Sequence, residues 1–290
     1  MGFRTVLISS RCKLEYSLNF LVCRDDEEKR IAIDEISTII IQNTGVAITA
    51  ALLSKLLESK VKVILCDPQS NPQGELVAYY GNFSTYNKIK AQLNWDGETK
   101  DCLWAKIIDQ KICNQARNLQ FLKKEEAKLL LEYSKGLLPN DPSNREGHAA
   151  KVYFPACFGD GFSRDDAKNP INACLNYGYS IILSAINREI KADGYLTEFG
   201  VHHIGETNPF NLSCDLMEPL RPYVDFLILN QQITPENFKV KAPAILSRKV
   251  HFKGAEVFLD NALHLYVQSL LGALNEHNSE LGEFISYELA

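Results

Sequence analysis

The sequence lacks the short motifs that mark common nucleotide-binding and serine-hydrolase sites. It contains no GxxxxGK loop followed by serine or threonine, no GxGxxG turn, and no serine in a GxSxG context. None of its eight cysteines is spaced as CxxC, the spacing typical of zinc and thiol-exchange sites. These absences leave P-loop nucleotide hydrolysis, dinucleotide-dependent chemistry, serine-nucleophile hydrolysis and a structural zinc without support.

Long apolar runs are also missing. No stretch reaches the length of a membrane span or a signal-peptide core. Most cysteines lie in apolar runs, such as VILCD around Cys66, and read as reduced, mostly buried thiols. We therefore expect a cytoplasmic protein without a membrane partner.

An excess of positive charge is absent as well. The chain has 31 Lys and Arg against 36 Asp and Glu, a formal net charge of -5. A protein of this charge holds nucleic acid only through a local basic patch, through metal ions or through the charge of a partner.

The 290 residues suffice for two domains with a substantial core. The first 80 or so residues are β-rich, because β-branched and aromatic residues with partial alternation recur. SLNFLV and STIIIQ are expected to form strands that pair antiparallel. One helix is expected in TGVAITAALLSKLLESK, where leucines recur at helical spacing. Strands are expected in FRTVLISS, CKLEYSLNFLVCR, KRIAIDEISTIIIQ and KVKVILCD.

Beyond a boundary near residues 80 to 85 the pattern becomes helical. Apolar residues at three- and four-residue spacing predict helices over about 84–94, 101–122 and 123–135, then from residue 142, within 169–194 and over 258–274. We therefore predict an α+β fold: a β-rich, sandwich-like domain with one helix over 1–83, and an all-α domain over 84–290.

The segment SNREGHAAKVYF allows two interpretations. Ser143 and Glu146 match a capping box, in which Glu146 satisfies the Ser143 backbone amide. Alternatively, the small residues Ala149 and Ala150 leave room beside the Glu146 carboxylate for a cation and its waters.

The segment from Gly200 to Pro222, GVHHIGETNPFNLSCDLMEPLRP, carries a histidine pair and two acids. His202 and His203 are adjacent, and two interpretations are open: one buried and one surface histidine, or a pair that belongs to a functional site. Paired carboxylates with a nearby imidazole suit a divalent metal. Asp215 and Glu218 could instead be two acids near the start of a helix whose N-cap is Ser213, with Arg221 offsetting their negative charge.

Taken together, these segments resemble the CRISPR-associated adaptation integrases, and most closely the compact members of type II systems. The resemblance covers nearly the whole chain and rests on the order and spacing of five segments. They are TGVAITAALLSKLLESKVKVILCD, KIIDQKICNQARNLQFL, REGHAAKVYF, NPINACLNYGYSIILSAI and DLMEPLRPYVD.

The resemblance implies a catalytic metal site. Its three ligands fall on Glu146, on His203, which follows Gly200 by three residues, and on Glu218. They would hold Mg²⁺ or Mn²⁺, with Asp215 and His202 as supporting residues. Basic residues are candidates for contacts to DNA phosphates, namely Arg145, Lys151, Arg164, Arg221, Arg248 and Lys253.

The same resemblance implies a function and partners. The enzyme would join the 3′-hydroxyl ends of protospacer DNA to a CRISPR array by transesterification, and with water as nucleophile it would act as an endonuclease. It would form a homodimer through its β-rich domain and bind a small ferredoxin-like adaptation partner, with a ring-forming DNA-end protein and an RNA-guided effector nuclease as further partners. Two alternatives stay open: a non-catalytic DNA-binding scaffold, and a stand-alone metal-dependent phosphodiesterase on RNA or branched DNA.

Overall fold

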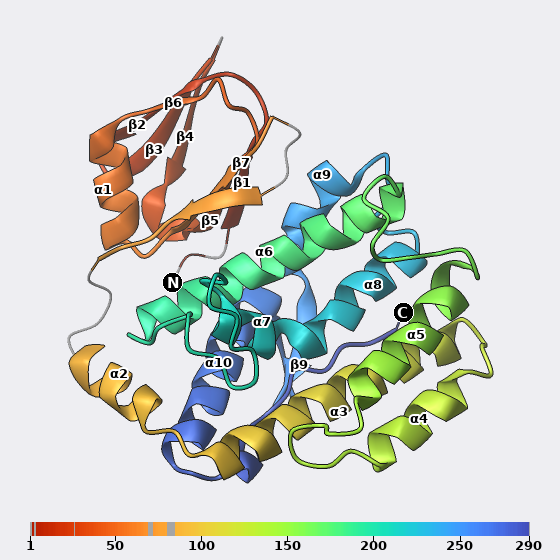
Figure 1. Ribbon diagram of the computed structural model, residues 1–290. Helices are drawn as coiled ribbons and strands as arrows, with labels where there is room; N and C mark the ends of the chain where they lie inside the picture. Colours follow the sequence, from red (N-terminus) through yellow and green to blue (C-terminus); the bar gives the residue numbers. More distant parts are fainter. Residues whose placement is uncertain (1, 3, 26, 69–71, 80–84, 290) are drawn as a thin grey trace.

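The computed structural model describes residues 2, 4–25, 27–68, 72–79 and 85–289. Strands dominate the part before residue 80 and helices the part after residue 84, as Figure 1 shows from red to blue. This order confirms the predicted α+β fold class. The predicted boundary between residues 83 and 84 lies outside the described residues.

The β-rich region contains two four-stranded sheets. In spatial order, one sheet consists of β1 (Arg4–Ile8), β5 (Ile36–Ile41), β7 (Lys62–Cys66) and β8 (Pro72–Leu76). The other consists of β4 (Glu28–Ala32), β3 (Phe20–Arg24), β2 (Lys13–Ser17) and β6 (Ala47–Ile48). One helix, α1 (Ala50–Glu58), packs its buried Leu52 and Leu56 onto this region, as the leucine spacing predicts.

The pairing of STIIIQ differs from the prediction. β3 does pair antiparallel, with β2 and β4, but β5 pairs parallel with both β1 and β7. All six residues of β5 are buried. Ile39 and Ile41 belong to the core of the β-rich region, whereas Ile40 packs into the helical core. A strand covered on both faces is typical of parallel sheets, and this explains its unbroken apolar sequence.

The predicted helical spans match the helices at 85–93, 97–121, 127–135, 145–158, 170–192 and 259–275, but three further helices between residues 211 and 241 were not predicted. Its helices are α2 (Thr85–Leu93), α3 (Gly97–Phe121), α4 (Ala127–Lys135), α5 (Arg145–Phe158), α6 (Pro170–Ala192), α7 (Asn211–Met217), α8 (Arg221–Leu229), α9 (Phe238–Lys241) and α10 (Leu259–Asn275). A short antiparallel hairpin of β9 (Lys249–Phe252) and β10 (Ala255–Phe258) interrupts the helices of a region expected to be all-α. None of the helices in the described ranges is both long and apolar enough to cross a membrane.

All eight cysteines are free thiols, as expected. Only Cys12, Cys66 and Cys174 are buried, and the other five are partly exposed. The expectation of mostly buried thiols therefore holds for fewer than half of them.

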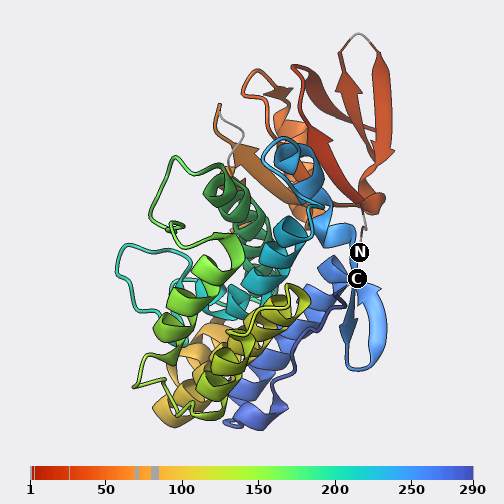
Figure 2. The same cartoon turned by 90° about the vertical axis from the view of Figure 1, so that its right-hand side faces the viewer.

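The two regions meet at α6 and α9 (Figure 2). At the end of β5, the Gln42 side-chain amide donates to the Tyr177 hydroxyl on α6 and to the Lys239 carbonyl on α9, each at 2.7 Å. Because Gln42 and Tyr177 are both buried, these bonds fix the sheet against the long central helix.

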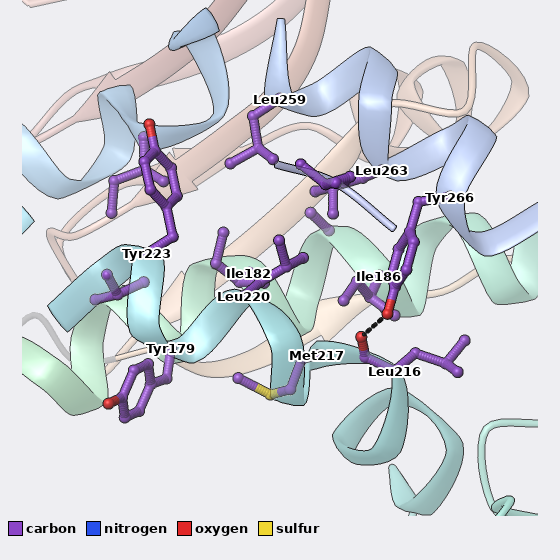
Figure 3. Close-up of a cluster of buried hydrophobic side chains, with 14 of the residues drawn as sticks. Tyr179, Ile182, Ile186, Leu216, Met217, Leu220, Tyr223, Leu259, Leu263 and Tyr266 are labelled. Carbon is purple, nitrogen blue, oxygen red and sulfur yellow. Dashed lines mark hydrogen bonds between the residues drawn. The ribbon is translucent and has the colours of Figure 1, made fainter. Parts of the chain in front are cut away.

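The core of the helical region supports the segment that carries Asp215 and Glu218 (Figure 3). Leu216, Met217 and Leu220 are buried against side chains of α6 and α10. The Tyr266 hydroxyl on α10 donates to the Leu216 carbonyl at 2.7 Å, drawn as the dashed line. Apolar burial and this hydrogen bond together fix the backbone on which both acids sit.

Close packing of α6 on α8 depends on Gly178. A Cβ at this position would lie 2.5 Å from Val224 Cγ1, and Val224 is fully buried. We expect Gly178→Ala to lower the free energy of unfolding by about 1–3 kcal/mol, because the helices must move apart. Urea unfolding of Gly178→Ala, Val224→Ala and the double variant would test this. The double variant should recover part of the loss, and strictly additive losses would contradict the packing argument.

Candidate metal and catalytic site

Glu146 sits in the first turn of α5. The cap of this helix is Asn144, whose side chain accepts the Gly147 amide at 3.1 Å. The Asp141 carboxylate accepts the amides of Arg145 and Glu146 at 2.8 and 2.9 Å. The capping-box interpretation of Ser143 and Glu146 is therefore wrong. Asn144 and Asp141 satisfy the first amides of the helix, and the Glu146 carboxylate points to α3 instead.

Asp215 on α7 is fully buried and holds the histidine loop. Its carboxylate accepts the backbone amides of Val201, His202 and His203 at 2.6, 2.9 and 3.2 Å. It also pairs with Nδ1 of His203. One carboxylate thus fixes three successive amides and one imidazole, and it acts on the loop rather than sharing a cation with Glu218.

The loop approaches Asp215 so closely that position 200 needs glycine. A Cβ on Gly200 would lie 2.4 Å from the His203 carbonyl oxygen and 2.6 Å from Oδ2 of Asp215. The proposed capping role of Ser213 is wrong, because α7 begins at Asn211. Ser213 is buried inside that helix and donates its hydroxyl to Asn187 on α6.

The rings of His202 and His203 lie 5.7 Å apart and both contact Trp104. Both residues are exposed, so the interpretation of one buried and one surface histidine is wrong. The His202 ring stacks on Trp104 of α3, with centroids 4.2 Å apart, and its Nδ1 lies 2.8 Å from Oδ1 of Asn140. The bond to Asp215 raises the pKa of His203, and the nearby Glu218 and Glu146 charges raise it further against the effect of burial. His203 therefore lies in the field of both glutamates, whereas His202 is held by aromatic stacking.

Glu146 and Glu218 meet at a lysine that the sequence analysis missed. The Lys111 ammonium on α3 lies 2.5 Å from Oε1 of Glu146 and 2.5 Å from Oε2 of Glu218. Arg221 contacts the other oxygen of Glu218 at 2.7 Å. A signal was present in the sequence: Lys111 falls at helical spacing with Ile107 and Ile108 on the apolar face of α3, where a lysine needs an acidic partner.

Electrostatics explain why these charges stay ionised. Burial alone would lower the pKa of Lys111, but the charges of Glu218 and Glu146 outweigh it and raise the pKa. Burial likewise opposes ionisation of Glu218, and Lys111 and Arg221 overcome it, so the pKa of Glu218 is lowered. Lys111 and Glu218 form the buried centre of the cluster, Glu146 and Arg221 lie at its partly exposed edge, and each charge is stabilised by the others.

The donor set fits a divalent metal in its chemistry. Two carboxylates on different helices already share one cation, which is what a bridging metal requires of them. Nδ1 of His203 pairs with the Asp215 carboxylate, so Nε2 is the ring nitrogen that could bind a metal. Within the described ranges no three acidic, histidine or cysteine side chains are close enough to hold a metal, and the Lys111 ammonium stands between the two glutamates.

A pocket of about 240 Å³ opens beside this cluster. It is lined by Lys111, Gln115, Glu146, Ala150, Phe154, Arg164, Tyr179, Glu218, Arg221 and Asp225. Asp225 on α8 is buried and accepts the Tyr179 hydroxyl. Burial raises the pKa of Asp225 to about 6, although bonds from Tyr179 and Tyr153 and the nearby arginines oppose the rise.

Asp225 should therefore make the stability depend on pH. The folded protein binds the Asp225 proton with a pKa of about 6 against an ordinary value of 3.8. Between these values the folded state carries more protons, so the free energy of unfolding falls as pH rises. Asp225→Asn should remove this fall, on the order of 3 kcal/mol between pH 4 and 7. Urea unfolding at several pH values would measure it, and an unchanged slope in the variant would contradict the assignment.

The comparisons with known proteins now decide the family. Residues 6–253 match the family model described as CRISPR associated protein Cas1. The chain belongs to the Cas1 family. A curated relative from Neisseria meningitidis, named CRISPR-associated endonuclease Cas1, is 36% identical over 236 residues, which span 79% of this chain and 76% of the relative. The predicted family is therefore confirmed, and with it assignment to a class of CRISPR-associated endonucleases.

Solved structures share the fold of this Cas1-family chain. A casposase bound to its integration product superposes with a TM-score of 0.78 at 20% identity, over 96% of this chain and 92% of that one. A chain of a Cas6-RT-Cas1–Cas2 complex gives a TM-score of 0.70 at 18% identity, covering 97% of this chain and 36% of that longer one. At these identities the likeness concerns the fold alone.

The basic residues predicted to contact DNA do not form one surface in this Cas1-family fold. Arg164 and Arg221 line the pocket beside the glutamates, and both lie over the Tyr179 ring. Arg164 is also bound by the side chains of Asn172 and Asn176 at 2.5 and 2.6 Å. These two arginines therefore share one pocket with Glu146 and Glu218.

The remaining four candidates are more scattered. Arg145 lies over the Tyr133 ring at 5.4 Å, and Lys151 is exposed on α5. Arg248 donates to Gln232, and Lys253 lies 3.7 Å from Glu283. Arg248 and Lys253 flank β9, whereas Arg145 and Lys151 belong to α5, so the six candidates divide into separate groups.

Proposed function

We propose that this protein is a metal-dependent DNA endonuclease and integrase of CRISPR adaptation. It joins the 3′-hydroxyl of an incoming duplex to a CRISPR array: a new bond forms between that oxygen and phosphorus, and the phosphodiester bond of the array strand breaks. One observation carries the proposal. Glu146 and Glu218, from separate segments, share a single cation, and His203, fixed by Asp215, lies in their field.

Glu146, His203 and Glu218 would hold one Mg²⁺ or Mn²⁺. When bound, the metal supplies a Lewis acid for the scissile phosphate and assists the attacking hydroxyl or water. Asp215 keeps Nδ1 of His203 protonated and so presents Nε2 as a ligand. Trp104 and Asn140 hold the supporting His202 and so restrain the loop.

The arginines of the pocket would bind the phosphodiester. Arg221 neutralises one oxygen of Glu218 and stacks on Tyr179 at 4.8 Å. Arg164 stacks on the same ring at 5.5 Å and on Phe154 at 5.7 Å. Planar guanidinium groups held in this way suit phosphate oxygens, because their donors are fixed before the ligand arrives.

The partners belong to the proposal as well. We propose a homodimer that acts with a small ferredoxin-like adaptation partner, a ring-forming DNA-end protein and the RNA-guided effector nuclease. A chain of this fold is part of a Cas6-RT-Cas1–Cas2 complex, and this favours partner proteins in general. The net charge of -5 also favours it, because a partner can supply the positive surface that DNA needs.

Strand joining in vitro tests the function. A short duplex with free 3′-hydroxyl ends would be incubated with a plasmid that carries a leader and repeat, the cognate small partner, and Mn²⁺, Mg²⁺ or EDTA. We expect joined products with either metal and none in EDTA.

The control variant is Glu146→Gln, which should bind DNA and join none. DNA binding without joining by the native protein would favour the non-catalytic scaffold. Cleavage of RNA or branched DNA that needs no partner would favour the stand-alone phosphodiesterase. Joining in EDTA would contradict the metal-dependent proposal.

A further inference from the structure

A lysine ammonium occupies the place of a shared cation. Lys111 is 8% exposed, and its ammonium contacts one oxygen of each glutamate. Burying an ammonium is unfavourable unless it is paired, and here the pairing is with two carboxylates at once. The two glutamates, and not packing alone, therefore determine where the Lys111 ammonium lies.

Two cations lie beside the two glutamates. Lys111 and Arg221 offset Glu146 and Glu218. Two carboxylates that share a buried site repel each other unless a cation stands between them. Lys111 meets this need and keeps the two acids close together.

A second acceptor lies one turn further along α3. Gln115 is 2% exposed and lines the same pocket as Lys111. Among the described residues its Oε1 is a buried oxygen with no hydrogen-bond partner. Residues four apart on a helix are neighbours, so an ammonium that leaves the glutamates can donate to Gln115 without leaving the pocket.

We propose that Lys111 is an internal cation that competes with the divalent metal for Glu146 and Glu218 and turns to Gln115 when the metal binds. This inference rests on the proposed metal site. It assigns Lys111 a positioning role: it keeps the carboxylates together before metal arrives, and it weakens metal binding because it has to be displaced.

The test is Mn²⁺ binding to the full chain, followed by the EPR signal of free Mn²⁺, with thermal unfolding in EDTA and in Mn²⁺. Lys111→Met should bind Mn²⁺ more tightly by about tenfold or more, because the competing charge is gone. Its melting temperature should fall in EDTA and rise further with Mn²⁺ than that of the native protein. Gln115→Met should bind Mn²⁺ more weakly than the native protein.

Lys106→Met is the matched control. It lies on the same helix, and its ammonium pairs at 2.7 Å with Glu280, whose side chain is 78% exposed. It should behave as the native protein does. If Lys111→Met does not fold in EDTA, circular dichroism should show that Mn²⁺ restores its helices. A helix content that stays unchanged when Mn²⁺ is added would overturn the inference.

Two other outcomes separate this inference from the proposed function. If the native protein binds Mn²⁺ and Lys111→Met binds it equally or more weakly, Lys111 does not compete with the metal, and the proposed metal site is retained. If neither protein binds Mn²⁺, both the inference and the metal-dependent function are wrong.

Discussion

Glu218→Gln is expected to abolish metal-dependent strand joining, lowering its rate by roughly a thousandfold or more. Loss of an outer partner of a metal ligand already costs about 10–100-fold in affinity or activity, and Glu218 is proposed as a ligand itself. The substitution keeps the shape of the side chain and removes its charge. Joining rates with Mn²⁺, at matched protein and DNA concentrations, measure the effect.

The same substitution should also destabilise the protein. Lys111 and Arg221 both contact the Glu218 carboxylate, which is 5% exposed. Removing one partner of a buried charge cluster costs on the order of 3–5 kcal/mol, because the remaining charges stay buried. Urea unfolding at pH 7 would show this loss. Mn²⁺ should not recover it, because the ligand is gone.

The control for Glu218→Gln is Glu125→Gln. The Glu125 side chain is 84% exposed and pairs with Lys128, whose side chain is 79% exposed. Surface pairs of this kind contribute little, so joining and stability should stay native. Joining by Glu218→Gln within a few-fold of the native rate would show that Glu218 is not part of the catalytic site.

Asp215→Asn is expected to cause the second largest loss. The buried carboxylate accepts three loop amides and the His203 imidazole, and an amide side chain cannot accept all four. We expect a loss of about 2–4 kcal/mol in the free energy of unfolding. Joining should fall about 10–100-fold, because His203 loses the partner that orients it.

Hydrogen exchange separates this effect from general instability. The amides of Val201, His202 and His203 should exchange faster in Asp215→Asn, whereas amides in the middle of α6 should keep their protection. Asp160→Asn, at an exposed position after α5, is the matched control and should leave both readouts unchanged. Native protection of the loop in Asp215→Asn would show that other contacts hold it.

The local elements follow from local sequence. The 3.6-residue spacing of apolar residues predicts α3, α6 and α10 to within a few residues of their ends, because each helix buries one face. The order of five segments in the chain identifies the Cas1 family. Neither result requires contacts between distant parts of the chain.

It is harder to predict which of two neighbouring residues with similar capping preference becomes the N-cap of a helix. Ser143 and Asn144 are both good caps, and the helix begins after Asn144, which adopts a left-handed conformation with φ of 51°. The sequence also does not predict that β5 pairs parallel with its neighbours, because an apolar run indicates burial but not the direction of the adjacent strands.

The order and spacing of residues along the chain predict most of the helices, the family, and the acids and histidine that we propose to be catalytic. The contact of Lys111 with two of these acids follows from the packing of distant segments, because its partners lie 35 and 107 residues further along the chain. The same packing determines that Asp215 holds the loop while Glu218 faces the shared cation. Such assignments depend on how α3, α5 and α7 pack together, and apolar periodicity fixes which face of a helix is buried without specifying what lies opposite.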